Sequence, residues 1–350
     1  MKNFFILSIT FLLFLNYGFS QQTQDSTLVI AEGQEDEVAY NEGIKLFKAQ
    51  KYQASIEKFT ETINLNRNFT QAFLNRGSAK MKLKQYNSAL QDLDTTIARN
   101  PNLPEPYYIK GRIFDLQNKK EDALNNYKIA EQKGYNEANL FYFVGVIKFQ
   151  EEAYDDAITY YTRAIDIDPK HAFSYNDRGS SKKMKEDYDG AIKDYEKATQ
   201  LDPKLALAFD NLSVVKSRKE DYDGAIIASN TAIKLKPDFY IAYNNRGTVY
   251  FFKEDYDKAI ADFNKAIELK DDYAYAYNNL GNAKHKKKDY QGSVDALNKA
   301  IELDPNYGTA YMNRAASKEM LRDTKGACED WNKAIELGIE QAQQYIGGCN

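Results

Sequence analysis

The amino-acid sequence predicts an all-α protein built from repeated helical hairpins, and three observations support this prediction. A small residue, usually Gly, returns every 34 residues from Gly43 onward. An aromatic residue stands four positions before it in eight of the nine periods, and a second small residue, usually Ala, stands twelve positions after it. Nine periods fit between residues 36 and 341 without insertion or deletion, which is typical of stacked structural units.

Within each period the pattern is that of two antiparallel helices. We number the positions of a period from 1, so that Asp36 occupies position 1 of the first period. Small residues at positions 8 and 20 let the two helices approach closely, and bulky residues at positions 4 and 24 fill the remaining space. Pro at position 32 ends the second helix in five periods, because proline cannot continue the helical hydrogen bonds. Since one hairpin cannot bury its apolar face alone, the hairpins are expected to stack into a solenoid.

This spacing resembles the tetratricopeptide repeat, a 34-residue helix–turn–helix unit. Nine repeats of 34 residues cover 306 of the 350 residues. The resemblance implies a right-handed superhelical solenoid with a concave groove, followed by a short C-terminal cap at 342–350. The nine repeats are expected at 36–69, 70–103, 104–137, 138–171, 172–205, 206–239, 240–273, 274–307 and 308–341.

The N-terminal 35 residues lack this period. Residues 1–20 have a positive Lys2, an apolar run and small residues at Gly18 and Ser20, which together are typical of a secretory signal peptide. The apolar run is shorter than the roughly 20 residues that cross a bilayer, so membrane contact is expected only if this signal stays uncleaved. Residues 21–35 are polar, acidic and aperiodic, and are expected to form a flexible leader. The mature protein is therefore expected to be exported, to the periplasm or beyond the cell.

Composition argues against catalysis and against nucleic-acid binding. Lys and Arg number 47 against 51 Asp and Glu, giving a net charge of −4, so no basic surplus is available for a phosphate backbone. The two histidines, His171 and His285, stand at unrelated repeat positions. No nucleotide-binding loop, paired metal ligands or nucleophile elbow occurs in the sequence. We therefore expect no catalytic residue, metal, cofactor or small-molecule substrate.

Arg at position 7 occurs together with Asp at position 23. Where position 7 is Leu212 or Leu280, position 23 is Ala instead, and the first repeat reverses the charges with Glu42 and Lys58. This exchange within one chain predicts that positions 7 and 23 touch across the hairpin, as an ion pair or as an apolar contact. The predicted ion pairs are Arg76 with Asp92, Arg178 with Asp194, Arg246 with Asp262, and Arg314 with Asp330. A phosphate-binding or acidic-ligand role for these arginines is the alternative.

Lysine recurs at position 11, where the family usually carries Tyr. We expect these side chains to extend along the surface and to place the amine near an acidic neighbour, although the pattern names no partner for them. They are Lys80, Lys148, Lys182, Lys216, Lys284 and Lys318.

Asparagine recurs on the face of the first helix that lies opposite the hairpin contact. At 100° per residue, positions 2, 5, 6, 9, 12 and 13 share this face, which the family resemblance places in the groove. An Asn amide both donates and accepts, so regularly spaced Asn can pair with a peptide backbone. This arrangement resembles the asparagine ladder of the O-linked N-acetylglucosamine transferase repeat domain, whose transferase domain has no counterpart here. The expected peptide-binding residues are Asn75, Asn211, Asn245, Asn279 and Asn313 at position 6, with Asn244, Asn278 and Asn282 beside them. A merely solvated polar position is the alternative.

The third and fourth repeats interrupt this ladder with apolar residues. Tyr108, Ile109, Tyr142 and Phe143 occupy the same positions and are expected to form an anchor pocket in the groove. Closer packing between repeats, or contact with the acidic leader, explains them equally well.

Both cysteines lie at the end of the array. Cys328 and Cys349 stand nearly symmetrically about the turn at Leu337 and Gly338, so two antiparallel segments could bring them together. An exported protein allows oxidation, and a disulfide is one expectation. A free, buried Cys328 that acts as a small apolar residue is the other.

These observations predict a non-enzymatic scaffold that binds an extended peptide or protein segment in its groove. The alternative is a structural component of an envelope complex that contacts its partners through the outer helices.

Overall fold

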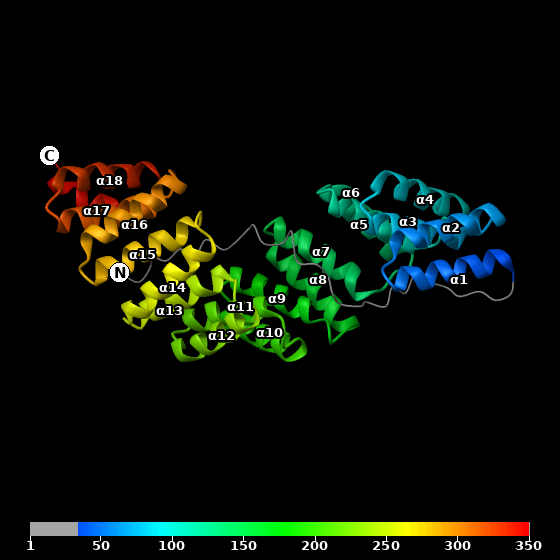
Figure 1. Cartoon of the computed structure of the whole chain (residues 1–350), viewed down its shortest axis with the longest axis horizontal. Coiled ribbons are helices and arrows are strands. Elements are labelled where there is room, and N and C mark those ends of the chain that lie inside the picture. Colours follow the sequence, from blue (N-terminus) through cyan, green and yellow to red (C-terminus); the bar gives the residue numbers. More distant parts are fainter. Residues whose placement is uncertain (1–33, 350) are drawn as a thin grey trace. The chain divides into compact units, whose positions relative to one another are not determined.

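The computed structural model describes residues 34–349, and all regular structure in that range is helical (Figure 1). It comprises eighteen α-helices and one short 3-10 helix, η1. This confirms the all-α class and the repeated hairpins predicted from the period. The signal segment 1–20 and the leader up to residue 33 lie outside the described residues.

The chain divides into two compact units at Pro169 and Lys170, each described here by itself. We call residues 34–169 the N-terminal unit and residues 170–349 the C-terminal unit. The N-terminal unit holds α1 (Glu35–Lys48), α2 (Tyr52–Leu65), α3 (Thr70–Lys82), α4 (Tyr86–Arg99), α5 (Glu105–Leu116), α6 (Lys120–Gln132), α7 (Ala138–Gln150) and α8 (Tyr154–Ile167).

The C-terminal unit holds five hairpins and the 3-10 helix. Its elements are α9 (Ala172–Met184), α10 (Tyr188–Leu201), α11 (Ala206–Arg218), α12 (Tyr222–Leu235), α13 (Tyr240–Phe252), α14 (Tyr256–Leu269), α15 (Ala274–Lys286), α16 (Tyr290–Leu303), α17 (Gly308–Met320), α18 (Thr324–Glu336) and η1 (Glu340–Gly348). In both units each odd-numbered helix packs against the next helix, and each hairpin packs against the hairpin that follows it within the unit. None of the described helices is long and apolar enough to cross a membrane.

Close helix approach explains the glycine at position 8. A Cβ added to Gly247 would lie 2.7 Å from a ring carbon of Phe263 on the partner helix, a distance that forces one of the two to move. In the hairpin that has Ser213 at position 8, position 24 carries the small Ser229 instead of a bulky side chain. In that hairpin a larger residue at position 8 thus faces a smaller residue at position 24.

The turn between the two helices of each hairpin has a fixed geometry. Position 15 has a positive φ in every hairpin, from 59° at Gln50 to 66° at Lys288. One residue later, an N-cap Asp starts the second helix in several repeats, as where the Asp289 side chain accepts a hydrogen bond from the Gly292 backbone N–H at 3.0 Å. This bond satisfies one of the free N–H groups at the helix start.

A disulfide closes the C-terminal end of the array. Cys328 in α18 and Cys349 after η1 are bonded, with their Cα atoms 5.5 Å apart. The Trp331 indole stacks on the Tyr345 ring with centroids 5.4 Å apart. Together these contacts hold η1 against α18, so that η1 covers the last hairpin.

Candidate functional site

In the C-terminal unit, a row of side-chain hydrogen bonds joins the first helices of successive hairpins. The Asn at position 6 donates its Nδ2 to the side chain at position 5 of the preceding repeat. The donor and acceptor pairs are Asn211 to Asn176 at 3.1 Å, Asn245 to Asp210 at 3.0 Å, Asn279 to Asn244 at 2.9 Å and Asn313 to Asn278 at 2.9 Å. The asparagine ladder therefore fastens α9, α11, α13, α15 and α17 to one another.

Burial divides the predicted peptide-binding asparagines into two groups. Four of them are 3 to 8% exposed, namely Asn244, Asn245, Asn278 and Asn279. The other three, Asn211, Asn282 and Asn313, are half-buried. Only the second group has enough exposed surface to contact a ligand, so the structure narrows the candidate set of this unit to three residues.

The half-buried amides keep hydrogen-bonding capacity after the ladder is formed. A primary amide carries two N–H donors and an oxygen with two lone pairs. Asn211 and Asn313 each use one N–H in the ladder, which leaves one N–H and the oxygen. One donor and one acceptor are what a bidentate bond to a peptide group requires.

Asn75 in the N-terminal unit is not a ligand contact. Its side chain is fully buried and donates Nδ2 to the Tyr40 hydroxyl at 2.8 Å. The prediction that Asn75 binds peptide is therefore wrong, because the neighbouring repeat covers the amide. The position 6 to position 5 bond has the same 35-residue spacing in both units.

The apolar residues of the third and fourth repeats also pack between helices. Ile109 is 3% exposed and belongs to a core cluster with Leu74 and Leu93. The Phe143 ring is 9% exposed and lies 3.2 Å below the guanidinium carbon of Arg112. Packing between repeats, the alternative to an open anchor pocket, therefore accounts for Ile109 and Phe143.

The two tyrosines of this set are placed differently. Tyr142 is 6% exposed and its ring centroid lies 5.9 Å from that of Tyr161 in the same hairpin. Tyr108 is half-buried and stacks on Tyr135 with centroids 4.5 Å apart. Of the four residues, Tyr108 retains the most surface for a partner.

A buried charge pair lies beside the ladder. Asp210 and Lys183 are 3% and 9% exposed. Burial raises the pKa of Asp210 to about 6, although hydrogen bonds from Asn245 oppose the shift. Burial lowers the pKa of Lys183 to about 8, although the Asp210 carboxylate opposes that shift. Sequence reasoning missed this pair, whose one signal was an Asp where α9, α13 and α15 have Asn at position 5.

The four predicted ion pairs are present as bidentate contacts between the two helices of a hairpin. Arg76 donates Nε and Nη2 to the two carboxylate oxygens of Asp92 at 2.9 and 2.7 Å. Arg246 does the same to Asp262 at 2.7 and 2.6 Å, and this bond raises the pKa of Arg246. The other two pairs are Arg178 with Asp194 and Arg314 with Asp330.

These arginines make structural contacts within and between hairpins. Arg246 also donates Nη1 to Asn230 of the preceding repeat at 2.6 Å. In two of the hairpins that lack the pair, Leu212 packs in one apolar cluster with Ala228, and Leu280 packs with Ala296. The prediction fails for the first repeat, where Lys58 instead forms an ion pair with Glu61 one turn along its own helix, at 2.7 Å.

The position 11 lysines find acidic partners. Lys80, Lys182 and Lys318 reach the same aspartates that the arginines contact, at 2.7, 2.8 and 2.8 Å. The other three contact acids near the hairpin turn or on the second helix, Lys148 with Glu151, Lys216 with Glu196, and Lys284 with Asp289. The co-occurrence of Lys at position 11 with Asp at position 23 was the signal that could have named the first three partners.

Both histidines make local contacts. The His171 side chain caps α9, accepting from the Ser174 backbone N–H at 3.2 Å. His285 Nδ1 lies 2.9 Å from the Ser317 hydroxyl of the next repeat, and burial lowers the pKa of His285. Among residues 34–349, no cluster of three or more His, Cys, Asp or Glu side chains could hold a metal ion.

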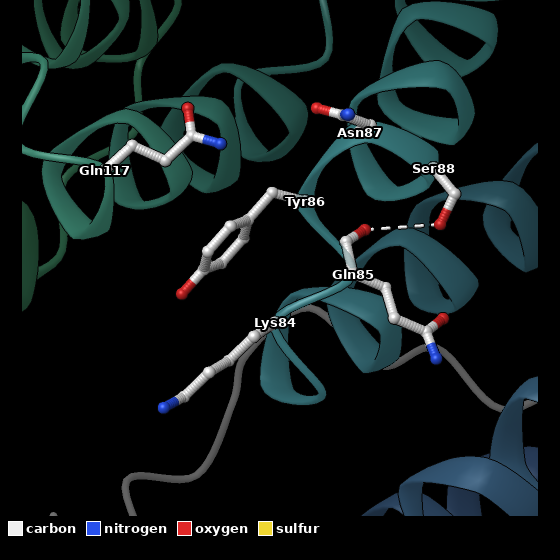
Figure 2. Close-up of a pocket in the computed structure, with 6 residues that line it drawn as sticks. All are labelled: Lys84, Gln85, Tyr86, Asn87, Ser88 and Gln117. Carbon is white, nitrogen blue, oxygen red and sulfur yellow. Dashed lines mark hydrogen bonds between the residues drawn. The ribbon is translucent and has the colours of Figure 1, made fainter.

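A surface pocket of about 450 Å³ lies in the N-terminal unit, between the start of α4 and the end of α5 (Figure 2). It is lined by Lys84, Gln85, Tyr86, Asn87, Ser88 and Gln117. The Ser88 hydroxyl donates to the Gln85 carbonyl at 3.2 Å. None of the residues predicted to bind a peptide lines this pocket.

Family models of known proteins match the same repeat that the 34-residue spacing predicts. Models described as tetratricopeptide repeat or TPR repeat match residues 108–172, 174–205, 247–288 and 274–307. No curated protein matches the sequence.

Solved structures show the fold. A chain of the APC/C hetero-tetramer Cut9–Hcn1 superposes with a TM-score of 0.59 at 17% identity, over 90% of this chain and 63% of that one. The pilF protein of Pseudomonas aeruginosa superposes with a TM-score of 0.54 at 15% identity, over 61% of this chain and 97% of that one. This chain thus spans under two thirds of the Cut9–Hcn1 chain. The repeat models and the shared fold establish that the chain contains tetratricopeptide repeats.

Proposed function

We propose that the protein is a non-enzymatic scaffold that binds an extended peptide or protein segment along the first helices of its C-terminal unit. Tetratricopeptide repeat proteins generally mediate protein–protein interaction and typically lack catalytic activity, and this chain contains such repeats. The residues proposed to contact the segment are Asn211, Asn282 and Asn313.

The observation that carries this proposal is the half-buried state of these amides. Asn211 in α11 and Asn313 in α17 stand at the same repeat position, three repeats apart. With about 10 Å between successive first helices, they are separated by roughly 30 Å, which an extended segment covers with about nine residues. Spaced amides hold such a segment by its backbone and leave its side chains largely unread.

An assembly role through the outer helices is the second candidate. Ile227 on α12 is 68% exposed, more than any other large apolar side chain on a second helix of this unit. Isolated apolar residues at a surface are ordinary, so this observation supports the alternative less strongly than the amides support a groove site.

We also propose that the mature chain is exported to the periplasm or beyond the cell. A disulfide persists in oxidising compartments, so the Cys328–Cys349 bond supports this location. N-terminal sequencing of the mature protein is expected to begin at Gln21. A mature chain that keeps Met1 or Lys2 would contradict removal of the signal.

Site-specific photocrosslinking separates the two functional candidates. A benzoylphenylalanine replaces either Asn282, on the proposed face, or Ile227, on the outer surface, in the full chain expressed in its host. Irradiation is expected to join the partner to the variant at 282 and not to the variant at 227. Crosslinking at 227 alone would favour the outer helices and refute the groove. Thermal unfolding of both variants checks that the fold is retained.

A further inference from the structure

Four tyrosine rings form a continuous row at the start of three first helices in the C-terminal unit. Tyr240 begins α13, Tyr273 is the N-cap of α15, Tyr275 lies in the first turn of α15, and Tyr307 is the N-cap of α17. From each ring to the next, the centroids lie 5.0, 5.7 and 5.1 Å apart, which is the distance of direct aromatic contact. We call these four residues the tyrosine row.

The hydroxyl groups of the tyrosine row reach the surface. All four side chains are half-buried. Among the residues that the structure describes, no group forms a hydrogen bond with these hydroxyls, and each hydroxyl oxygen keeps some contact with solvent. A large apolar body with a free polar end is typical of tyrosines that a partner covers. Tyr275 stands at position 2, on the same helix face as the asparagine ladder.

The charges around the row are mainly negative. Four Asp and two Lys occur in the three loops that lead into these helices, at 236–238, 270–272 and 304–306. Lys270, which lies near Tyr240, forms an ion pair with Asp272 at 2.7 Å. Lys236 lies over the Phe239 ring, 5.1 Å from its centroid. The other three carboxylates make no ion pair with any described residue, and they belong to Asp238, Asp271 and Asp304.

Two tyrosines of the row also lie beside a carboxylate. Burial raises the pKa of Tyr273, and the Asp210 carboxylate adds to the shift. Burial raises the pKa of Tyr307 as well, and there Asp304 adds to the shift. Both phenols therefore stay protonated, and a positively charged group placed on the row would meet negative charge around it.

Aromatic faces and carboxylates both attract cations. An arginine side chain suits this combination best, because its planar guanidinium stacks on a ring while its five N–H groups reach phenol and carboxylate oxygens. We propose that the tyrosine row binds a segment of a partner protein through arginine side chains of that segment. This inference rests on the proposed function, since it names the chemistry of the segment that α13, α15 and α17 would contact.

The repeat sets the spacing of these arginines. Tyr273 and Tyr307 both stand at position 34, in adjacent hairpins, so they lie about 10 Å apart. An extended segment advances about 3.3 Å per residue, and 10 Å therefore corresponds to about three residues. Arginines at every third position of the segment match the row.

Two synthetic peptides test this proposal. One has Arg at every third position between Ser residues, and the other has citrulline, which has nearly the same shape without the charge, in place of each Arg. Binding of each fluorescent peptide to the full mature chain is measured by anisotropy. The Arg peptide is expected to bind at least about tenfold more tightly, because each cation gains from both a ring face and a carboxylate. The preference is expected to weaken as salt is added.

Variants of the rings separate an aromatic site from attraction to the acidic chain as a whole. Tyr273→Leu with Tyr275→Leu removes two ring faces at constant net charge, and is expected to reduce the preference for Arg to less than about threefold. Tyr273→Phe with Tyr275→Phe keeps the faces and is expected to retain most of the preference. The matched control is Tyr222→Leu with Tyr256→Leu, at half-buried tyrosines that begin α12 and α14 at the other end of the hairpins. This control is expected to bind as the wild-type protein does, and circular dichroism checks the helices of each variant.

Two exposed carboxyls allow a test that leaves the packing untouched. Asp238→Asn with Asp271→Asn removes two negative charges beside the row, and is expected to lower the preference for Arg and to make it less sensitive to salt. Glu319→Gln with Glu329→Gln makes the same charge change at exposed positions near the end of α17 and in α18. This second pair is expected to leave the preference intact.

Equal affinity for the two peptides, no binding of either, or an equal response of the row variants and their controls would overturn the inference. The proposed function has a separate test, the crosslink at Asn282. A partner crosslinked there in a chain indifferent to arginine would leave the groove site standing and remove the arginine-bearing segment.

Discussion

At the scale of single residues, the ladder shows why a carboxylate can replace an amide at a buried position. The acceptor at position 5 is an amide oxygen in Asn176, Asn244 and Asn278, and a carboxylate in Asp210. Both geometries satisfy the Nδ2 donor of the next repeat. The carboxylate adds a charge that burial disfavours, and Lys183 compensates it in part.

Asp210→Asn is therefore expected to change how stability depends on pH. The pKa of Asp210 is about 6 in the folded protein and about 3.9 when the chain is unfolded. Between these values the folded state binds a proton that the unfolded state does not, so this carboxyl adds stability as the pH falls from 7 to 5. Relative to the Asn variant, the wild-type protein is expected to gain about 1 kcal/mol over that interval.

Urea unfolding of the wild-type protein and of Asp210→Asn at pH 7 and pH 5 measures this difference. Asp271→Asn, at an exposed carboxyl, is the matched control and is expected to show no comparable gain. If the wild-type protein and the Asp210 variant lost stability in parallel on acidification, the buried carboxyl would not be the source of the effect.

At the scale of helix pairs, the contact between positions 7 and 23 was predictable because the residues at these two positions change together from one repeat to another. Arg with Asp and Leu with Ala both fill the space between two helices, as at Arg246–Asp262 and Leu212–Ala228. The same reasoning failed at Glu42 and Lys58, since a closer acid was present one turn away from the lysine.

The effect of replacing Arg246 on the free energy of unfolding is expected to depend on whether Asp262 is replaced as well. Arg246→Ala leaves the Asp262 carboxylate buried without its guanidinium, and a loss of about 3 kcal/mol in unfolding free energy is expected. Arg246→Leu combined with Asp262→Ala reproduces the apolar pair of the preceding hairpin and is expected to lose less than about 1 kcal/mol. Chemical unfolding of both proteins provides the comparison.

Peptide affinity should stay unchanged in both Arg246 variants, because the pair lies within the hairpin. A double variant as unstable as Arg246→Ala would contradict the equivalence of the two contacts. Loss of partner binding at full stability would instead favour the ligand-binding alternative for the arginines.

The repeated sequence pattern predicts those features of the fold that recur at the same position of every repeat, and it predicts little else. The repeat gave the helices, their pairing and the close approach at Gly247, since these recur in phase. It gave the face of each first helix but not what covers that face. Several residues expected to be open to a ligand are therefore buried, namely Asn75, Asn244, Asn245, Asn278, Asn279, Ile109, Tyr142 and Phe143. The positive φ at position 15 had no sequence signal, because none of the nine residues there is Gly.

At the scale of the whole molecule, each hairpin contacts mainly the hairpins next to it within its own unit. In such arrays stability is close to a sum of repeat and interface contributions, and an end repeat lacks one interface. In the C-terminal unit, η1 and the Cys328–Cys349 bond cover the last hairpin. The disulfide is therefore expected to stabilise the last hairpin and η1 against local unfolding.

Cys328→Ser with Cys349→Ser tests this role by hydrogen exchange. The bond spans 21 residues, and removing a cross-link over a loop of that size costs about 3 kcal/mol when the chain opens. Protection is expected to fall in α18 and η1, while α9 and α11 keep theirs, since coupling passes only from one hairpin to the next. The wild-type protein under reducing conditions should reproduce the pattern. An equal loss in α9 would mean that the unit opens as a single cooperative body, and the nearest-neighbour description would then not hold for it.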